Sequence, residues 1–383
     1  MRRRLMTSSL ILPYLVIYIP QLIIGLLLIE IAFSFDIEVG VAGQLGTTSS
    51  IVSAIMALLM GVLSVRYRHK SLLLAGLTVL SISALGCYIT PTFGLLLIVF
   101  AVTGISFAMV RPMSQALIGS LFSVTERPKV IGYLYGGMAL AYVFGPSVIN
   151  VIDDWRLTFV LFLLPLTIVS LFLALVAVPS TSSSTPSSQR YIQGFRAVLQ
   201  NKSAIACVIA NVLFGMAVRV LHFYNVPFYQ QQFFVDKAFL SVIVSGVSLV
   251  FVVGSLIGGR LVSQVGRKQL TVICALITGV LTFAYINVPS LWLSLVFLII
   301  ATFTTSVRNT AYDSLALEQV PAYRGTMMSL SQFSQNVAWA LGNGLGGFIL
   351  IAFDYGYMGV LGITAIIASL IFHVFTIDPT QQG

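Results

Sequence analysis

Three arginines, Arg111, Arg219 and Arg308, lie inside long apolar stretches of the chain. A guanidinium binds carboxylate or phosphate groups bidentately, and a charge at the middle of a membrane is costly enough to indicate a function. In the alternative interpretation, each arginine holds a neighbouring helix through backbone carbonyls or an acid such as Asp313. The elements that carry these residues decide what chemistry they can do.

Candidates for proton exchange are His222, Asp313 and Glu30. His222 follows Arg219 by three residues, so the two share a helix face and could contact a substrate or form an interhelix ion pair. Histidine titrates near neutral pH, although a lone histidine can equally be a hydrogen-bonded structural residue. Asp313 could be a protonatable site or the partner of another arginine. Glu30, near a helix end, could be only an interfacial residue.

Polar and aromatic side chains in the same stretches are candidates for lining a binding cavity. Tyr312 follows Arg308 by four residues and shares its face, whereas Asp313 lies about 140° away around the helix. Some of these side chains will instead bond helix to helix. The set comprises Tyr14, Tyr18, Gln21, Gln115, Asn309, Tyr312, Gln332, Gln335 and Asn336.

The composition places these residues in a membrane protein. Of 383 residues, 58% are hydrophobic and 8% are charged, against about 25% charged in soluble domains. The three cysteines have no metal-site spacing, and the chain contains no P-loop or hydrolytic motif. We therefore expect no enzyme activity, no metal and no cofactor. The net charge of +9 forms no continuous patch, so we expect no nucleic-acid partner.

Apolar runs long enough to span a bilayer predict an all-α protein with twelve transmembrane helices. Residues 71–110 and 269–307 are free of charge, and each run is broken once, at Pro91 and at Pro289. The apolar run after Met1 continues to about Phe33, so we interpret it as a retained helix rather than a signal peptide. The predicted spans are 8–34, 40–65, 71–90, 94–122, 128–151, 157–179, 204–230, 238–262, 269–287, 291–317, 324–351 and 356–376.

The chain divides into two repeated six-helix bundles, 1–179 and 204–383, joined by a polar cytoplasmic linker at 180–203. We expect a short surface helix from Gly194 to Lys202 in this linker. Seven residues match between the halves at an offset of 198 or 197: Gly61, Leu63, Lys70, Pro91, Arg111, Arg127 and Gly145 match Gly259, Leu261, Lys268, Pro289, Arg308, Arg324 and Gly342. Arg111 and Arg308 are thus repeat mates at the same predicted depth.

Basic residues are strongly biased to one side of this topology. Fifteen fall on the side of the N-terminus, and only Arg156 and Lys237 fall on the other. The positive-inside rule places both termini in the cytoplasm. The protein is expected in a prokaryotic plasma membrane, as a monomer surrounded by lipid.

The loops after the second and eighth spans resemble the signature G-x-L-a-D-r-x-G-r-K of the major facilitator superfamily. The first copy carries Gly61, Arg66 and Lys70, with Val65 for the aspartate and Arg68 for the second glycine. The second carries Gly259, Gly266, Arg267 and Lys268, with Ser263 for the aspartate. The resemblance implies a cytoplasmic charge network that locks one conformation, in which Glu318 could pair on the Arg267 side.

The segment Ala141–Pro146 is similar to the G-x-x-x-G-P motif of the drug:proton antiporter branch, with Gly145 and Pro146 in place. In that branch the motif bends the helix and seals a proton leak. The resemblance also implies that the helices of Arg111 and Arg308 line a central cavity, where the two guanidiniums would clamp an anion.

Together these features predict a secondary transporter for a small organic solute that works by alternating access. The first hypothesis is proton-coupled efflux of an anionic or amphipathic compound. The second is import or exchange of small organic anions without proton coupling. The third is a non-transporting membrane sensor, against which the intact repeat and the absence of an appended domain argue.

Overall fold

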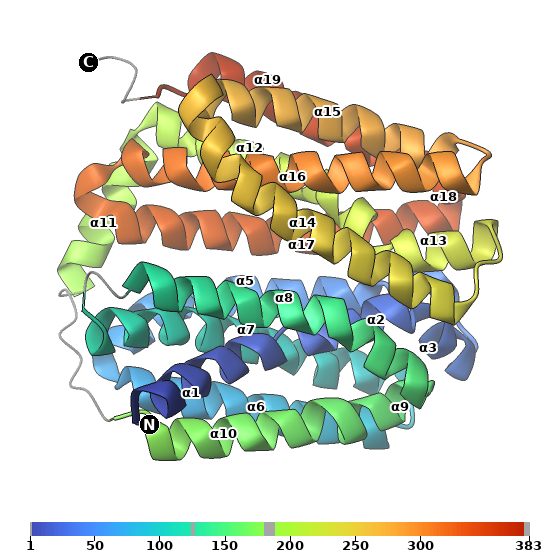
Figure 1. The fold of residues 1–383 in the computed structure, drawn as a ribbon, viewed down its shortest axis with the longest axis horizontal. Coiled ribbons are helices and arrows are strands. Elements are labelled where there is room, and N and C mark those ends of the chain that lie inside the picture. The colour runs from blue at the N-terminus through green and yellow to red at the C-terminus, as the bar shows by residue number, and fades with distance from the viewer. Residues whose placement is uncertain (1, 124–126, 180–187, 379–383) are drawn as a thin grey trace. The chain divides into compact units, whose positions relative to one another are not determined.

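The structure is a computed structural model that describes residues 2–123, 127–179 and 188–378. Side chains are described for these residues except 2–5, 61, 62, 65, 127–129 and 188–192. Residues 180–187 of the predicted linker lie outside the described residues. Within the described ranges all regular secondary structure is helical, which confirms the predicted all-α class (Figure 1).

The helices of the first half of the sequence match the six predicted spans. Several spans are built from two or three consecutive helical pieces. They are α1 (Arg2–Val16), α2 (Ile19–Leu26), α3 (Leu28–Ser34), α4 (Val39–Ala42), α5 (Gln44–Arg66), α6 (His69–Ile89), α7 (Phe93–Leu121), α8 (Arg127–Ile152), α9 (Trp155–Thr158), a π-helical turn (Phe159–Leu163) and α10 (Leu164–Ala177).

The second half repeats this order. After the linker helix α11 (Ser188–Gln200), its helices are α12 (Lys202–Phe223), α13 (Asn225–Gln232), α14 (Lys237–Val265), α15 (Arg267–Asn287), α16 (Leu291–Gln319), α17 (Arg324–Ala352), α18 (Tyr355–Met358) and α19 (Gly362–Phe375). Short 3₁₀ turns at Pro321–Tyr323 and Gly359–Leu361 precede α17 and α19. The linker helix α11 is longer than the short helix expected from Gly194 to Lys202.

Eleven helical segments within the described residues are long and apolar enough to cross a bilayer. The remaining predicted span is α17, which has 29 residues and would extend about 44 Å at 1.5 Å per residue. It is long enough to span, but Gln332, Gln335, Asn336 and Asn343 reduce its apolar character. Polar side chains in a spanning helix are expected to face protein or water rather than lipid.

The same helices pack together in both halves. In the first half α1 contacts α8 and α10, and α6 contacts α7 and α10; in the second, α12 contacts α17 and α19, and α15 contacts α16 and α19. These helices occupy corresponding places in the repeat. The packing therefore confirms the two pseudo-symmetric six-helix bundles predicted from the aligned residues (Figure 1).

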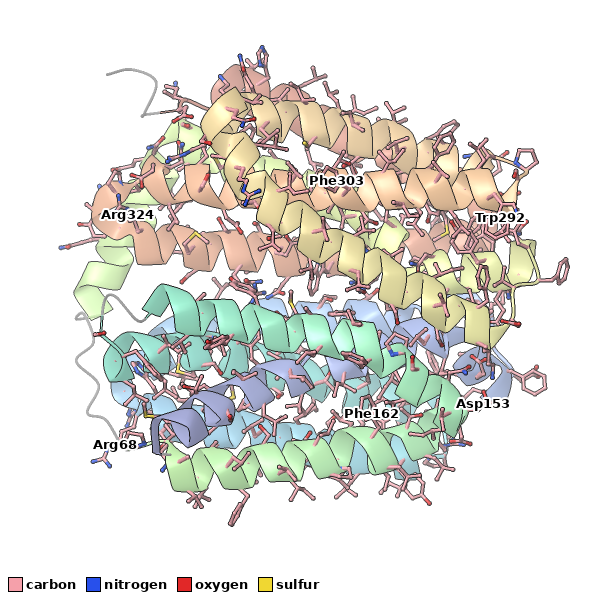
Figure 2. All side chains as sticks on the ribbon, viewed as in Figure 1. Arg68, Asp153, Phe162, Trp292, Phe303 and Arg324 are labelled. Carbon is pink, nitrogen blue, oxygen red and sulfur yellow. The ribbon has the colours of Figure 1, made fainter. Side chains whose placement is uncertain are left out.

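Corresponding helix ends are built in corresponding ways. Asp154 starts α9 by accepting a hydrogen bond from the backbone of Leu157, and Asp354 starts α18 by accepting bonds from Gly356 and Tyr357. Such N-caps satisfy amide groups that have no partner within the helix. The corner at Asp153 and the start of α17 at Arg324 are labelled in Figure 2.

By packing, the chain forms two compact units. The first contains Met1–Ile37, Gln44–Ser187 and Lys237–Ser245. The second contains Glu38–Gly43, Ser188–Asp236 and Gly246–Gly383. Each unit thus includes one short segment from the opposite half of the sequence.

Candidate functional site

Arg111 lies in an aromatic cluster of the first unit. Its guanidinium is 5.7 Å from the centre of the Phe107 ring, and the half-buried side chain is carried by α7. Tyr18 packs edge-on against Phe107 with ring centres 5.3 Å apart, and Tyr14 lies 5.6 Å from Tyr18. Tyr135 of α8 lies 6.0 Å from Tyr14. Rings and phenol groups around a guanidinium form an amphipathic surface.

The other predicted polar residues of this unit lie on α2 and α7. Gln21 of α2 approaches the Ser49 hydroxyl at 3.5 Å, and Ser49 bonds Thr103 of α7 at 2.9 Å. This chain connects helices, as polar residues in membrane bundles often do. Gln115 is half-buried on α7, four residues after Arg111.

Arg308 is the most deeply buried charged residue among those of the second unit whose side chains are described. Its side chain is 1% exposed on α16. Nη1 donates to Oδ1 of Asn211 at 2.9 Å and to Oδ1 of Asn309 at 3.4 Å. The guanidinium carbon lies 4.1 Å from the centre of the Phe214 ring and 4.4 Å from that of Tyr312. The shared face of Arg308 and Tyr312 is therefore confirmed.

Arg308 has an N–H group that is not used in a hydrogen bond to a described residue. Its buried Nε–H has no hydrogen-bond partner among the described residues, and no carboxylate of those residues lies within ion-pair distance. Neutral amide oxygens and aromatic faces stabilise a guanidinium without cancelling its charge. Asp313 is exposed on α16, five residues further along.

Residues near Arg308 are held by hydrogen bonds to neighbouring helices. The Tyr312 hydroxyl donates to the backbone carbonyl of Cys207 at 3.2 Å and also bonds Ser331. On α17, Asn336 is buried, and the buried Nε2 of Gln332 has no hydrogen-bond partner among the described residues. Gln335 is half-buried beside Gly215.

Arg219 occupies a second aromatic cluster in the same unit. The side chain is 7% exposed, and Nε donates to Oδ1 of Asn343 at 2.9 Å. Its guanidinium lies 4.8 Å from the centre of the Phe223 ring and 4.9 Å from that of Trp339. His222 is half-buried, and its ring faces Phe251 edge-on at 6.3 Å.

The glycine-rich stretch 342–347 serves helix packing. A Cβ on Gly342 would lie 2.8 Å from Cβ of Arg219 and 2.9 Å from the Met216 carbonyl oxygen. A Cβ on Gly346 would lie 2.7 Å from the Tyr224 ring. These glycines allow α17 to approach α12 closely, as small residues do at membrane helix interfaces.

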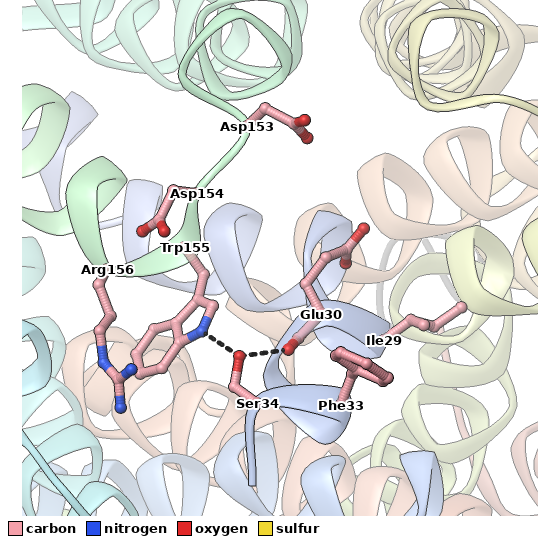
Figure 3. Close-up of a pocket in the computed structure, with 8 residues that line it drawn as sticks. All are labelled: Ile29, Glu30, Phe33, Ser34, Asp153, Asp154, Trp155 and Arg156. Atoms are coloured by element: carbon pink, nitrogen blue, oxygen red, sulfur yellow. Dashed lines mark hydrogen bonds between the residues drawn. The ribbon is translucent and has the colours of Figure 1, made fainter. Parts of the chain in front are cut away.

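Glu30 lies beside a cavity of about 310 Å³ at one end of the first unit, lined by Ile29, Glu30, Phe33, Ser34, Asp153, Asp154, Trp155 and Arg156 (Figure 3). Trp155 Nε1 donates to Ser34 Oγ at 3.0 Å, and Ser34 Oγ donates to the Glu30 carbonyl at 2.7 Å. The three acids are already engaged. Asp154 caps α9, and Lys237 binds Glu30 at 2.9 Å and Asp153 at 2.5 Å.

The loops that resemble the family signature make different contacts in the two copies. In the first, the guanidinium of Arg66 lies 5.9 Å from the Tyr67 ring centre, and Lys70 donates to the Leu175 carbonyl at 2.8 Å. Gly61 lies within α5, outside the residues whose side chains are described. Arg68, which replaces the second glycine, has φ −65°.

In the second copy, Gly266 has φ 92°, a conformation that favours glycine. Gly259 faces open space, and Lys268 is half-buried at the start of α15. The expected pairing of Glu318 with Arg267 is wrong. Glu318 accepts two bonds from Arg324 at 3.0 and 2.8 Å, whereas Arg267 approaches the Ser314 carbonyl at 3.5 Å. Arg324 lies six residues after Glu318, beyond the 3₁₀ turn Pro321–Tyr323, and its guanidinium contacts the Glu318 carboxylate in place of Arg267.

The segment similar to the antiporter motif lies within the continuous helix α8. A Cβ on Gly145 would lie 2.5 Å from Cδ2 of Leu22, so this glycine permits close packing on α2. Pro146 has no backbone N–H, and its carbonyl accepts a hydrogen bond from Ser241 at 3.2 Å.

Sequence reasoning missed the residues that hold the arginines, namely Asn211, Phe214, Trp339 and Asn343. Asn211 was detectable as an amide within an apolar run, by the criterion that found the arginines. Asn343 was hidden in the glycine-rich stretch. Among the described residues, no group of three His, Cys, Asp or Glu side chains could hold a metal ion.

Comparison with known proteins gives the same architecture. Residues 10–234 and 208–383 match the family described as Major Facilitator Superfamily. An uncharacterized MFS-type transporter of Bacillus subtilis (strain 168), YceJ, is 23% identical over 335 residues, which cover 87% of this chain and 86% of the relative.

Two solved structures share the fold. A D-xylose–proton symporter superposes with a TM-score of 0.80 at 15% identity, over 99% of each chain. A bacterial homolog of the human lysosomal transporter Spinster, in an inward-facing and occupied conformation, gives a TM-score of 0.79 at 15% identity over 99% of this chain and 98% of that one. The chain, an integral multi-pass membrane protein, belongs to the Major Facilitator Superfamily of transporters.

Proposed function

We propose that the protein is a proton-coupled secondary transporter that exports an anionic compound or an amphipathic compound with an anionic group. The observation that carries this proposal is Arg308, a charge buried in a membrane helix without a carboxylate within ion-pair distance among the described residues. Burial of a charge that no carboxylate contacts is costly, so a site that keeps one is expected to receive the opposite charge.

The contacts of Arg308 favour a ligand rather than a purely structural role. Asn211 and Asn309 both accept from Nη1, so they occupy only one edge of the guanidinium. The buried Nε–H has no described acceptor and can donate to a carboxylate or phosphate oxygen. Phe214 and Tyr312 flank the group with apolar surface. This combination suits an anion attached to an apolar body.

Arg111 is proposed as the corresponding group of the first bundle. It is the repeat mate of Arg308, and the rings of Tyr14, Tyr18, Phe107 and Tyr135 surround it. We propose that Arg111 is an anion-binding group of the first unit, as Arg308 is of the second, and that Arg219 and His222 contact other parts of a substrate bound at Arg308. Gln21, Gln115, Asn309, Gln332 and Asn336 are the proposed neutral hydrogen-bonding groups.

Proton coupling is assigned to Asp313. Glu30 is paired with Lys237 and lies near a helix end, which makes it a weaker candidate for carrying the proton. His222 is the alternative carrier. We propose export because Gly145 and Pro146 resemble the antiporter motif, and we propose that both termini lie in the cytoplasm of a prokaryotic cell because basic residues are biased to that side.

Ligand-induced stabilisation of the purified protein tests the proposal. A panel of organic anions and matched neutral analogues is screened for a rise in thermal unfolding temperature. Arg308→Gln should abolish stabilisation by the anions, Arg308→Lys should retain part of it, and the exposed control Arg260→Gln should behave as the parent. Undiminished stabilisation of Arg308→Gln by the anions would exclude the assigned site.

Flux in proteoliposomes then tests the coupling. Substrate movement in the parent should change the internal pH, and Asp313→Asn should abolish that change while substrate still binds. A parent that moves substrate without any change in internal pH would rule out proton coupling.

A second function, exchange of small organic anions without proton coupling, is supported by one observation. The ion pair between Lys237 and Glu30 removes one of the three proton-exchange candidates predicted from the sequence. In an exchanger, efflux of labelled substrate should require substrate on the opposite side, whereas a proton-coupled exporter responds to a pH gradient alone.

A further inference from the structure

Two short segments pack with the unit that contains the opposite half of the sequence. Glu38–Gly43 belongs to the second unit, and Lys237–Ser245 belongs to the first. The repeat offset of 198 places residues 38–43 on residues 236–241, so the two segments are repeat mates. Each contains the start of a long spanning helix, but the two are held by different chemistry.

The first segment is held by close backbone packing. Gly40 lies so near the Gly347 carbonyl oxygen that a Cβ would collide with it, and Gly43 lies equally close to the Tyr224 hydroxyl. Both neighbours belong to the second unit. Contacts of this kind do not depend on charge and are insensitive to salt.

The second segment is held by polar side chains that share one face of α14. Lys237, Ser241 and Ser245 are spaced four apart. Lys237 Nζ binds Glu30 Oε1 at 2.9 Å and Asp153 Oδ1 at 2.5 Å. The Ser241 hydroxyl shares its proton between the Pro146 carbonyl at 3.2 Å and the Lys237 carbonyl of its own helix at 3.0 Å, and Ser245 donates to the Val143 carbonyl at 2.7 Å. All of these residues belong to the first unit.

The acceptors on α8 lie close to Tyr142, whose carbonyl lacks its helical donor because residue 146 is proline. Pro146 cannot donate to the carbonyl four residues before it, so the backbone here is less constrained than in a regular helix. Asp153, the first residue after α8, has φ 52° and stands apart from the capping residue Asp154 (Figure 3). The C-terminal part of α8 and the residue that follows it thus present two carbonyls and one carboxylate to one face of α14.

The ion pairs are partly exposed, with side-chain exposures of 34% for Lys237, 21% for Glu30 and 58% for Asp153. Partly exposed pairs are weakened by salt and contribute modestly to stability. Without Lys237, the two carboxylates would lose the cation that they share. The electrostatic energy of the contact between α14 and the two carboxylates therefore depends mainly on Lys237.

We propose that Lys237, Glu30, Asp153, Ser241 and Ser245 form a releasable ion latch. When the latch is closed, the start of α14 is held on α8. When it opens, this end of α14 leaves α8 and exposes the face that carries Ser241. The glycine contact at Gly40 has no such release, because no charge contributes to it.

Thiol labelling tests the latch without a substrate. The full-length protein, with Cys87, Cys207 and Cys274 replaced by alanine, is reconstituted with a reporter Ser241→Cys or, independently, Ile149→Cys on α8. Both parent positions are buried, so a membrane-impermeant maleimide should react slowly. Lys237→Met should increase the labelling rate several-fold, and the matched variant Lys202→Met should leave it unchanged.

Two further measurements complete the test. Raising the salt concentration from about 0.01 to about 1 M, over which the Debye length falls from about 30 to about 3 Å, should speed labelling with Lys237 intact and have little effect in Lys237→Met. The exchanged pair Lys237→Glu with Glu30→Lys should restore slow labelling. Rates that respond to neither Lys237→Met nor salt, or equally to Lys202→Met, would overturn the proposal. If Lys237→Met fails to fold, the salt dependence with Lys237 intact decides.

Discussion

Asp36 and Phe234 adopt the same left-handed backbone conformation, with φ 51° and φ 53°, at positions 198 residues apart. Each follows the first spanning helix of its half and turns the chain toward the next. The repeat therefore preserves a backbone geometry where it has not preserved the residue type. Aspartate tolerates this conformation better than a bulky aromatic residue, because its short side chain can bond locally.

Replacing Phe234 by asparagine should stabilise the protein. The side chain is 89% exposed, so little packing is lost, and relief of the left-handed conformation should contribute about 1 kcal/mol. Unfolding of the purified protein in mild detergent measures the gain. Phe233→Asn is the control, because Phe233 has φ −116° and gains nothing by this mechanism. Equal effects at 233 and 234 would contradict the explanation.

Gly266→Ala should destabilise the protein, since φ 92° and ψ 147° suit only glycine. The expected cost is about 1–3 kcal/mol. The repeat mate Arg68 has φ −65° and ψ 137°, so Arg68→Ala should be nearly neutral by the same unfolding assay. A neutral Gly266→Ala would show that the turn before α15 adapts without strain.

Gly342→Ala should force α17 away from α12. The new Cβ would meet the Met216 carbonyl at 2.9 Å, and backbone cannot move aside as a flexible side chain can. Overpacking of this kind costs about 1–3 kcal/mol. Gly325→Ala on the same helix faces open space and serves as the control in thermal unfolding. The prediction fails if both alanines are equally tolerated.

Asn211→Leu should destabilise the second bundle, because it removes the 2.9 Å acceptor of a buried guanidinium. A lost hydrogen bond to a buried charge costs about 1–3 kcal/mol. The double variant Asn211→Leu with Arg308→Met should recover part of the stability, since no charge is then left without an acceptor, although the bonds from Asn211 to Ser331 and Ser334 stay lost. Recovery of stability without recovery of anion binding would separate the structural role of this pair from its proposed function.

Glu318→Gln should have a small effect, below about 1 kcal/mol, because its pair with Arg324 is largely exposed. The effect should be the same in an Arg267→Gln background and should disappear in an Arg324→Gln background. A double-mutant cycle on unfolding measures both coupling energies. Coupling to Arg267 instead would restore the pairing expected from the family signature.

Sequence patterns predicted the helices well because the bilayer imposes a long apolar run on every span. Pro91 and Pro289 marked the breaks between α6 and α7 and between α15 and α16 correctly. The repeat also located Arg111 and Arg308 on corresponding helices. The repeat could not predict how each helix is rotated against its neighbours. That rotation places Asn211, which lies 97 residues before Arg308, where it accepts a hydrogen bond from the guanidinium.

Contacts between side chains at the helix ends could not be predicted from the sequence either. Glu30 and Lys237 are distant in sequence, and nothing in either local pattern indicates that they meet. Glu318 had two basic residues within reach in the predicted topology, and the turn at Pro321–Tyr323 brought Arg324 to it instead of Arg267. Pairings of this kind depend on the path of a few backbone residues, which periodicity does not encode.

The placement of Glu38–Gly43 and Lys237–Ser245 also bears on how such a chain could arise and be divided. If the repeat descends from duplication of one six-helix ancestor, two identical copies of that ancestor would have exchanged the segment that corresponds to Glu38–Gly43 and Lys237–Ser245. Such an exchange is a domain-swapped dimer. A polypeptide cut within 180–187 would then yield two fragments. The N-terminal fragment would lack Lys237–Ser245, and the C-terminal fragment would lack Glu38–Gly43, although each segment packs in that fragment's unit. Such fragments should assemble when expressed together and be poorly soluble in detergent when expressed singly.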